Sequence, residues 1–357
     1  DPFRRFYSCL VFVPRDKYNT QVRQRIEKVV RDALAATSVD SQVEISESNL
    51  ARVYIVAHTL PSKEVRIDLA RLERSVETAV RSWGDAFKDS LQAQFDESRA
   101  LQLYARYAGA FPAAYTEDFD ARVATRDVGF LEALESHPEV LHLDIYRLEG
   151  RGADKFFLKI FRKQDAIAIS DVLPMLENMG LKVIAERPYE LELAPGRRAW
   201  IQDLEIELRS TPSTKFERLE PEIKSAFTAI WNRATDNDSF NQLTLSAGLP
   251  WREVMIIRAY SRFLLQAGLP FSQGYMAQVL INQSELTRLL AELFTTRFSP
   301  QLRPAARQSA LKRLHARINA KLEAVTRSDE DRILRGYWNA LRATVRTASR
   351  PAMARPW

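Results

Sequence analysis

The chain has 357 residues, of which 46% are hydrophobic and 27% are charged, a composition typical of a soluble, well-packed protein with two or three domains and not of a disordered one. No window offers the ~18 uncharged apolar residues that a membrane-spanning helix needs, and nothing at the N-terminus resembles a signal peptide. We therefore expect a cytoplasmic protein without membrane contact. The single cysteine, Cys9, excludes an internal disulfide, and its apolar, strand-like surroundings predict a small buried residue.

The net charge of +6 is unevenly distributed, because residues 297–357 hold 14 Lys and Arg against 4 Asp and Glu. Such a basic end favours a helix face that is exposed or docked on another domain. A nucleic-acid-binding protein stays open as an alternative, although few aromatic residues interleave with the basic ones and no zinc-finger, RNP or Gly-x-x-Gly signature appears. The basic residues available to neutralise phosphates are Arg303, Arg307, Lys312, Arg313, Arg317 and Lys321.

The first hundred residues predict a β-α-β-β-α module. An apolar strand is expected at Arg4–Pro14, followed by an amphipathic helix that begins behind Asn19. Two strands follow, one around residues 43–45 and one at Ala51–Thr59. The apolar periodicity then predicts one long helix from Ile67 to about Phe95.

After a mainly helical stretch, a second module repeats the β-α-β-β order without a visible sequence repeat. Ser170 and Asp171 are predicted to cap its helix, and Gly180 is predicted to end it. Its four strands are expected at His142–Leu148, Phe156–Phe161, Leu181–Leu193 and Ala199–Leu208.

Beyond Pro212 the pattern becomes entirely helical, so the fold class is predicted as α+β. Ser328 is expected to cap the final helix, with acidic residues in its first turn. A seam of apolar residues spaced by three and four must pack against another helix; it consists of Leu311, Leu314, Ile318, Leu322 and Val325.

No motif for catalysis, nucleotide binding or metal binding is found, and we assign no residue to any of these roles. Gly150 and Gly152 are the only glycines two apart, and Lys155 stands where a dinucleotide fingerprint needs the third glycine. No Gly-Lys-Ser/Thr occurs, and no two histidines have metal-binding helical spacing. His58 is predicted to be a hydrogen-bonded core or edge residue.

The loop after the first strand is the candidate site for a small effector. Arg15 and Asp16 carry opposite charges directly before the helix that Asn19 opens. A helix N-terminus attracts a carboxylate, and Asp or Asn can hold an ammonium group, so an amino-acid effector could bind Arg15, Asp16 and Asn19. A solvated loop with an N-cap is the simpler interpretation.

Four segments, in this order, resemble the region that precedes the catalytic domain in the large bacterial NAD-dependent glutamate dehydrogenases. They are FYSCLVFVPRDKYNTQVRQRI (Phe6–Ile26), ISDVLPMLENMGLKVIAERPYEL (Ile169–Leu191), AGLPWREVMIIRAYSRFLLQAGLPFSQGYM (Ala247–Met276) and DEDRILRGYWNALRATVRT (Asp329–Thr347). After Thr347 the chain departs from the family pattern. Because it opens at Asp1 in the middle of a plausible strand, we expect its natural reading frame to begin upstream.

The resemblance implies ACT-like modules at residues 1–98 and 141–210, a helical connector at 99–140, and a helical region at 211–357 leading toward a catalytic domain outside the chain. It also implies a parent enzyme that oxidatively deaminates L-glutamate with NAD, and no cofactor is expected to bind this segment. Allosteric control and assembly of a homo-oligomer are the implied roles, with other domains and subunits of the same enzyme and an amino-acid effector as partners. A stand-alone amino-acid-sensing ACT-like protein is a further alternative.

Overall fold

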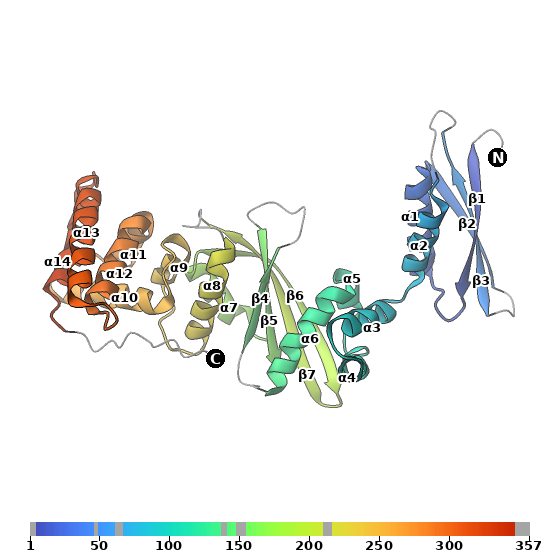
Figure 1. Cartoon of the computed structure of the whole chain (residues 1–357), viewed down its shortest axis with the longest axis horizontal. Coiled ribbons are helices and arrows are strands. Elements are labelled where there is room, and N and C mark those ends of the chain that lie inside the picture. The colour runs from blue at the N-terminus through green and yellow to red at the C-terminus, as the bar shows by residue number, and fades with distance from the viewer. Residues whose placement is uncertain are drawn as a thin grey trace. The chain divides into compact units, whose positions relative to one another are not determined.

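The structure is a computed structural model of the chain (Figure 1), and it contains two compact units, residues 1–129 and 130–357. Each unit is described by itself below. The residues described are 5–45, 49–60, 67–136, 141–147, 155–209 and 216–346.

The N-terminal unit begins with a three-stranded antiparallel sheet in the order β1-β3-β2, covered on one face by two helices. Alternate side chains of β3, among them Val53 and Ile55, pack against the apolar stripe of α1, as the period-2 and period-3.6 patterns require. The predicted β-α-β-β-α order is confirmed. Its elements are β1 (Phe6–Pro14), α1 (Thr20–Leu34), β2 (Ser38–Ile45), β3 (Leu50–His58) and α2 (Leu69–Val80).

Two local predictions for this unit have different outcomes. Asn19 is the N-cap of α1, as predicted, and its side-chain oxygen accepts a hydrogen bond from the Val22 backbone N–H at 2.9 Å. Cys9, predicted to be a small buried residue, packs against the core but is only half-buried, because it lies in the edge strand β1. Partial burial still raises the pKa of its thiol.

The single helix predicted over Ile67–Phe95 is wrong, since the chain forms α2 and then a separate helix α3 (Trp83–Gln94). The reason is a capping box at Ser82, whose hydroxyl accepts from the Asp85 backbone N–H while the Asp85 carboxylate accepts from the Ser82 N–H. These hydrogen bonds provide acceptors for two backbone N–H groups at the start of α3, so a new helix begins there. The stretch that follows is helical, as predicted, and contains α4 (Glu97–Tyr107), α5 (Ala113–Asp118) and α6 (Ala121–Ser136).

The second unit opens with a four-stranded antiparallel sheet in the order β4-β5-β7-β6. Helices α7 and α8 supply apolar side chains to one core with this sheet, including Leu176 and Phe227. After the leading strand β4, the predicted order of strand, helix, strand and strand is confirmed. The elements are β4 (His142–Tyr146), β5 (Lys155–Lys163), α7 (Ile169–Asn178), β6 (Leu181–Ala194), β7 (Arg197–Leu208) and α8 (Phe216–Trp231).

The two ends of α7 were predicted with unequal success. Its N-cap is Ala168, which makes no side-chain capping bond, so the cap predicted at Ser170 and Asp171 is wrong. Asp171 instead lies in the first turn, where its charge complements the helix dipole. Gly180 follows the helix with φ +83°, the left-handed conformation predicted from its position.

We expect Gly180→Ala to destabilise the second unit by roughly 1–3 kcal/mol. A Cβ at this position would lie 2.9 Å from Cγ of Gln242, and φ is in the region that only glycine adopts freely. Urea denaturation would measure the loss. Gly274→Ala is the control, because its Cβ would meet nothing within 4 Å; equal stability of the two variants would contradict the prediction.

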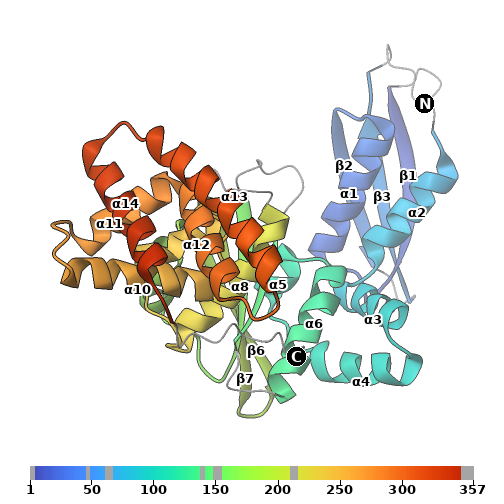
Figure 2. The same ribbon diagram turned by 60° about the vertical axis from the view of Figure 1, so that its left-hand side comes forward.

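The rest of the second unit is helical (Figure 2), as the sequence predicted. Its core joins residues from six α-helices, α9 to α14, and includes Ile257, Met276, Leu289, Ile318 and Leu334. The elements are the 3-10 turn η1 (Ser239–Gln242), α9 (Leu243–Ser246), α10 (Trp251–Gln266), α11 (Gln273–Asn282), α12 (Ser284–Phe298), α13 (Pro304–Glu323) and α14 (Ser328–Ala343). No helix within the described ranges is long and apolar enough to cross a membrane.

The predicted seam of α13 is confirmed: Leu314, Ile318 and Leu322 are buried, and Leu311 and Val325 pack against the same cluster. The predicted cap of α14 is wrong, because Arg327 is the N-cap and Ser328 is already the first helical residue. The three acidic residues expected in the first turn of α14 do lie there.

Candidate functional site

The loop predicted to bind an effector joins β1 to α1. Asn19 uses its side-chain oxygen as the helix cap, and the Arg15 backbone N–H donates to the Asn49 carbonyl at 3.0 Å. The side chains of Arg15 and Asp16 are exposed. The three residues therefore share one loop, and an effector role for them stays a prediction.

Lys17, in the same loop, makes a contact that sequence patterns did not reveal. Its ammonium donates to the Asp85 carboxylate at 2.6 Å, and this bond, together with that from Ser82, lowers the pKa of Asp85. The loop is thereby tied to the first turn of α3. Both side chains are more than a third exposed, so the contact orients the loop and adds little stability.

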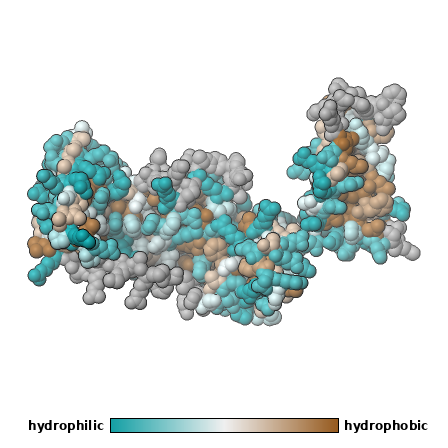
Figure 3. Space-filling model, in the orientation of Figure 1, coloured by the Kyte–Doolittle hydropathy of each residue, from teal (hydrophilic) through white to brown (hydrophobic). Residues whose placement is uncertain are grey.

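The sheet of the N-terminal unit carries apolar side chains on the face turned away from α1 and α2. We call this surface the outer face and define it by Phe6, Leu10, Phe12, Leu50 and Tyr54, which are 36%, 53%, 52%, 42% and 45% exposed. Hydrophobic atoms are visible on the surface of this unit in Figure 3. An antiparallel sheet with one wet face normally alternates apolar and polar residues, so these five apolar side chains, which share their face with Ser8, Arg52 and His58, form a candidate interaction surface.

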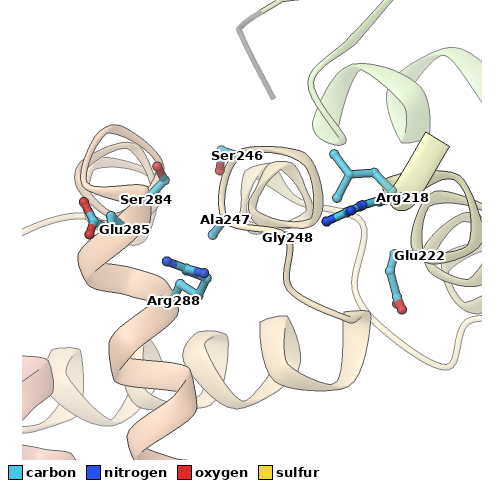
Figure 4. A pocket seen from close by; sticks show the side chains of 9 residues that line it. Arg218, Glu222, Ser246, Ala247, Gly248, Ser284, Glu285 and Arg288 are labelled. Atoms are coloured by element: carbon cyan, nitrogen blue, oxygen red, sulfur yellow. The ribbon is translucent and has the colours of Figure 1, made fainter. Parts of the chain in front are cut away.

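A cavity of about 640 Å³ lies in the second unit among α8, α9 and α12 (Figure 4). Its volume falls in the range of small-molecule sites. Gly248, at φ +68°, turns the chain beside it. The polar side chains that line it include Arg218 and Glu222 of α8, Ser246 of α9, and Glu285 and Arg288 of α12.

Among the described residues, most of the charged side chains around this cavity have no ion-pair partner, and Arg218, Glu285 and Arg288 are exposed. Arg218 and Glu222 are one turn apart on α8, yet no ion pair within 4 Å joins them, and Arg288 likewise has no ion pair with a described residue. Glu285 is the exception, since Lys321 donates to it at 2.5 Å and lowers its pKa.

The basic residues proposed as a nucleic-acid surface lie on or next to α13. Arg307 donates to the carbonyls of Ser299 and Leu302, and Lys321 is engaged by Glu285. Arg313 and Arg317 are exposed. Two of the six side chains therefore have partners inside the protein, and nucleic-acid binding stays an untested alternative.

His58 and His315 each lie within hydrogen-bond distance of a polar side chain. Nε2 of His58 lies 3.1 Å from the Asp40 carboxylate, so the hydrogen bond predicted for it is confirmed. His315 accepts from the Trp338 indole N–H, and burial together with Arg342 and Arg297 lowers its pKa. In the part of the chain that the structure describes, no group of three or more His, Cys, Asp or Glu could hold a metal ion. His137 lies outside the described residues.

Comparison with known families gives four matches in chain order. Residues 1–84 match "Glutamate dehydrogenase, ACT2 domain" and residues 90–134 match "Glutamate dehydrogenase, helical motif 2". Residues 140–219 match "Glutamate dehydrogenase, ACT3 domain" and residues 235–300 match "Glutamate dehydrogenase, helical motif 3". The chain is a segment of the large NAD-specific glutamate dehydrogenase family. The family resemblance drawn from the sequence is confirmed, whereas the domain limits at residues 98, 140 and 210 stay predictions.

Curated members of this family are similar along nearly the whole chain. The NAD-specific glutamate dehydrogenase of Halomonas elongata is 39% identical over 350 residues, which are 97% of this chain and 21% of that protein. Those of Pseudomonas aeruginosa and Mycobacterium tuberculosis are 36% and 30% identical over 349 and 365 residues, each covering 97% of this chain and 22% of the relative. The chain thus spans 21–22% of these glutamate dehydrogenases.

The sequence did not point to the cavity of this glutamate dehydrogenase segment. Arg218, Ser246 and Arg288 are spread over three helices and form no motif. Gly248 and Pro250, which interrupt the helical pattern, are the local signal for the turn beside it. The packing of α8, α9 and α12 brings the three side chains together.

Proposed function

We propose that the chain is a regulatory and scaffolding segment of a cytoplasmic, homo-oligomeric NAD-dependent glutamate dehydrogenase. The whole enzyme converts L-glutamate, NAD and water to 2-oxoglutarate, ammonia and NADH, and NAD binds outside this segment. The matches to ACT domains and helical motifs over most of the chain support this role.

The scaffolding role rests on one observation, the apolar outer face. Its five side chains are between 36% and 53% exposed, although each belongs to a regular strand of the sheet. Covering such a surface with another part of the enzyme releases water from apolar groups, which stabilises association by roughly 25 cal/mol per Å² of buried apolar area. A contact of this kind links domains or subunits without any catalytic group.

The full-length enzyme with Leu10→Asp tests this proposal. We expect its subunit association to weaken at least about tenfold, because an unpaired carboxylate is costly to bury. Sedimentation would report smaller species, and glutamate-dependent NADH formation would fall with them. Gln24→Asp, on the exposed side of α1, adds the same charge and should leave mass and rate unchanged.

Two outcomes would contradict the proposal. If Leu10→Asp has the wild-type mass and rate, the outer face has no scaffolding role. If the full-length enzyme forms no NADH from L-glutamate and NAD, the activity assigned to the parent is wrong.

A further inference from the structure

We infer that an exposed apolar face of α10 docks the part of the parent enzyme that continues the chain beyond Arg346. We call this surface the docking face and define it by Met255, Ala259 and Phe263. The inference rests on the proposed function in one respect, that the chain is a segment of a longer enzyme, and the chain spans 21–22% of its relatives. The docking face lies in the second unit, whereas the outer face of the first sheet lies in the N-terminal unit.

The docking face is an apolar stripe along α10. Met255, Ala259 and Phe263 follow one another at intervals of four residues, so they lie on one side of the helix. Met255 is 39% exposed, Phe263 is 54% exposed, and Ala259 is exposed between them. The opposite side of α10 carries Ile257 and Leu264, which are buried in the helical core. Apolar side chains on both sides are typical of a helix that has neighbours on both sides.

The end of α14 is fastened to α10 and α12. In Figure 2, α14 lies against α10. The hydroxyl of Tyr260 on α10 is hydrogen-bonded to that of Thr344, with 2.6 Å between the two oxygens. From α12, the Arg297 guanidinium donates to the carbonyls of Leu341 at 3.4 Å and Arg342 at 2.9 Å. Side chains of two other helices therefore fix the place from which the chain continues.

This place adjoins the docking face. Tyr260 lies three positions before Phe263, and such residues are neighbours on a helix surface. Val345, directly after Thr344, is 82% exposed. A segment tethered this closely meets the docking face at a high effective concentration, without the cost of bringing two molecules together. The tether favours the continuing chain over a second copy as the occupant.

Basic side chains border the docking face and define the chemistry of its occupant. Arg252 and Arg262 are exposed on α10, and Arg342 is exposed at the end of α14. Arg262 pairs with Asp236 at 3.0 Å, on the exposed surface. An apolar surface with an acidic rim complements both the stripe and the arginines around it.

Methionine oxidation tests the inference directly. Among the methionines that the structure describes, Met255 is exposed, whereas Met175, Met179 and Met276 are buried. Hydrogen peroxide converts an accessible thioether to the sulfoxide, which peptide mass spectrometry measures. We expect Met255 to be oxidised at least about tenfold more slowly in the full-length enzyme than in the 357-residue chain. Gln24→Met, on the exposed side of α1, is the control reporter and should react at the same rate in both proteins.

Phe263→Asp shows whether the docking face itself causes the protection. The variant should restore fast oxidation of Met255 in the full-length enzyme, because an unpaired carboxylate is costly to bury. Phe263 is more than half exposed, so the melting temperature of the 357-residue chain should stay unchanged.

Three outcomes would overturn the inference. They are equal oxidation of Met255 in the full-length enzyme and the 357-residue chain, protection that persists in Phe263→Asp, and protection that is lost on dilution, which would indicate a second copy. The measurement uses neither NADH formation nor the mass of the Leu10→Asp enzyme, so the two proposals fail separately.

Discussion

Arg258→Ala is expected to lower the free energy of unfolding of the second unit by roughly 3–5 kcal/mol. Arg258 lies on α10 with only 1% of its surface exposed. It donates to both oxygens of Asp238, at 2.8 and 2.9 Å, and to the side-chain oxygens of Asn241 at 2.7 Å and Thr235 at 2.8 Å. Its removal leaves these acceptors without their donor and opens a void next to Phe240.

The network has a further consequence, because Asp238 is also the cap of η1. Its Oδ1 accepts from the Phe240 backbone N–H at 3.1 Å and from Arg258, so one carboxylate joins the turn to α10. Hydrogen exchange in the variant should therefore accelerate in residues 235–246 as well as in α10.

Urea denaturation followed by circular dichroism would measure the effect, and hydrogen exchange would assign it to the second unit. Arg262→Ala is the matched control one turn away. Arg262 is 54% exposed in its side chain and pairs with Asp236 at 3.0 Å, so its loss should cost no more than about 1 kcal/mol. Similar losses in the two variants would show that the buried network does not stabilise the helical region.

Phe87→Ala is expected to destabilise the N-terminal unit by a similar amount, roughly 3–5 kcal/mol. Phe87 is fully buried on α3, with its ring 5.1 Å from that of Trp83 in a stacked arrangement and 5.6 Å from that of Phe111 edge-on. Tyr104 packs against it from α4. Truncation removes a large apolar surface and leaves a cavity that rigid aromatic neighbours fill poorly.

Trp83 fluorescence would follow unfolding near this cluster. Hydrogen exchange of α3 to α5 would detect the same change. Leu101→Ala is the control, because Leu101 is 45% exposed on α4 and should shift stability by about 0.5 kcal/mol or less. A Phe87→Ala protein as stable as the control would mean that the cluster is not a core.

The features that sequence patterns predicted well are those that depend on a few neighbouring residues. Apolar runs and period-2 alternation located the strands of both sheets, although β2 was predicted only around residues 43–45, and the amphipathic stripe located α1. Asn19 and Gly180 were correctly read as helix ends because a short side-chain acceptor and a left-handed backbone are local requirements. The α+β order of the chain follows from these local preferences.

Where two local signals competed, the prediction failed. The apolar periodicity continues across Ser82, but the capping box with Asp85 ends one helix and starts another. At α7 and α14, hydroxyl and acidic residues that resemble caps lie inside the first turn, because packing of the helix decides where its first residue lies. The N-cap predicted from these residues then differs from the observed N-cap by one or two residues.

The amino-acid sequence by itself determined the strands, the amphipathic helix faces and the family, because each can be recognised from short-range periodicity or from contiguous segments. Tertiary structure alone decided that Arg258 is buried with partners up to 23 residues away, that five apolar side chains of the outer face are exposed, and that Arg218, Ser246 and Arg288 line one cavity. The physical reason is that the burial and charge environment of a side chain depend on which distant elements pack around it. Such pairings leave no regular spacing along the chain.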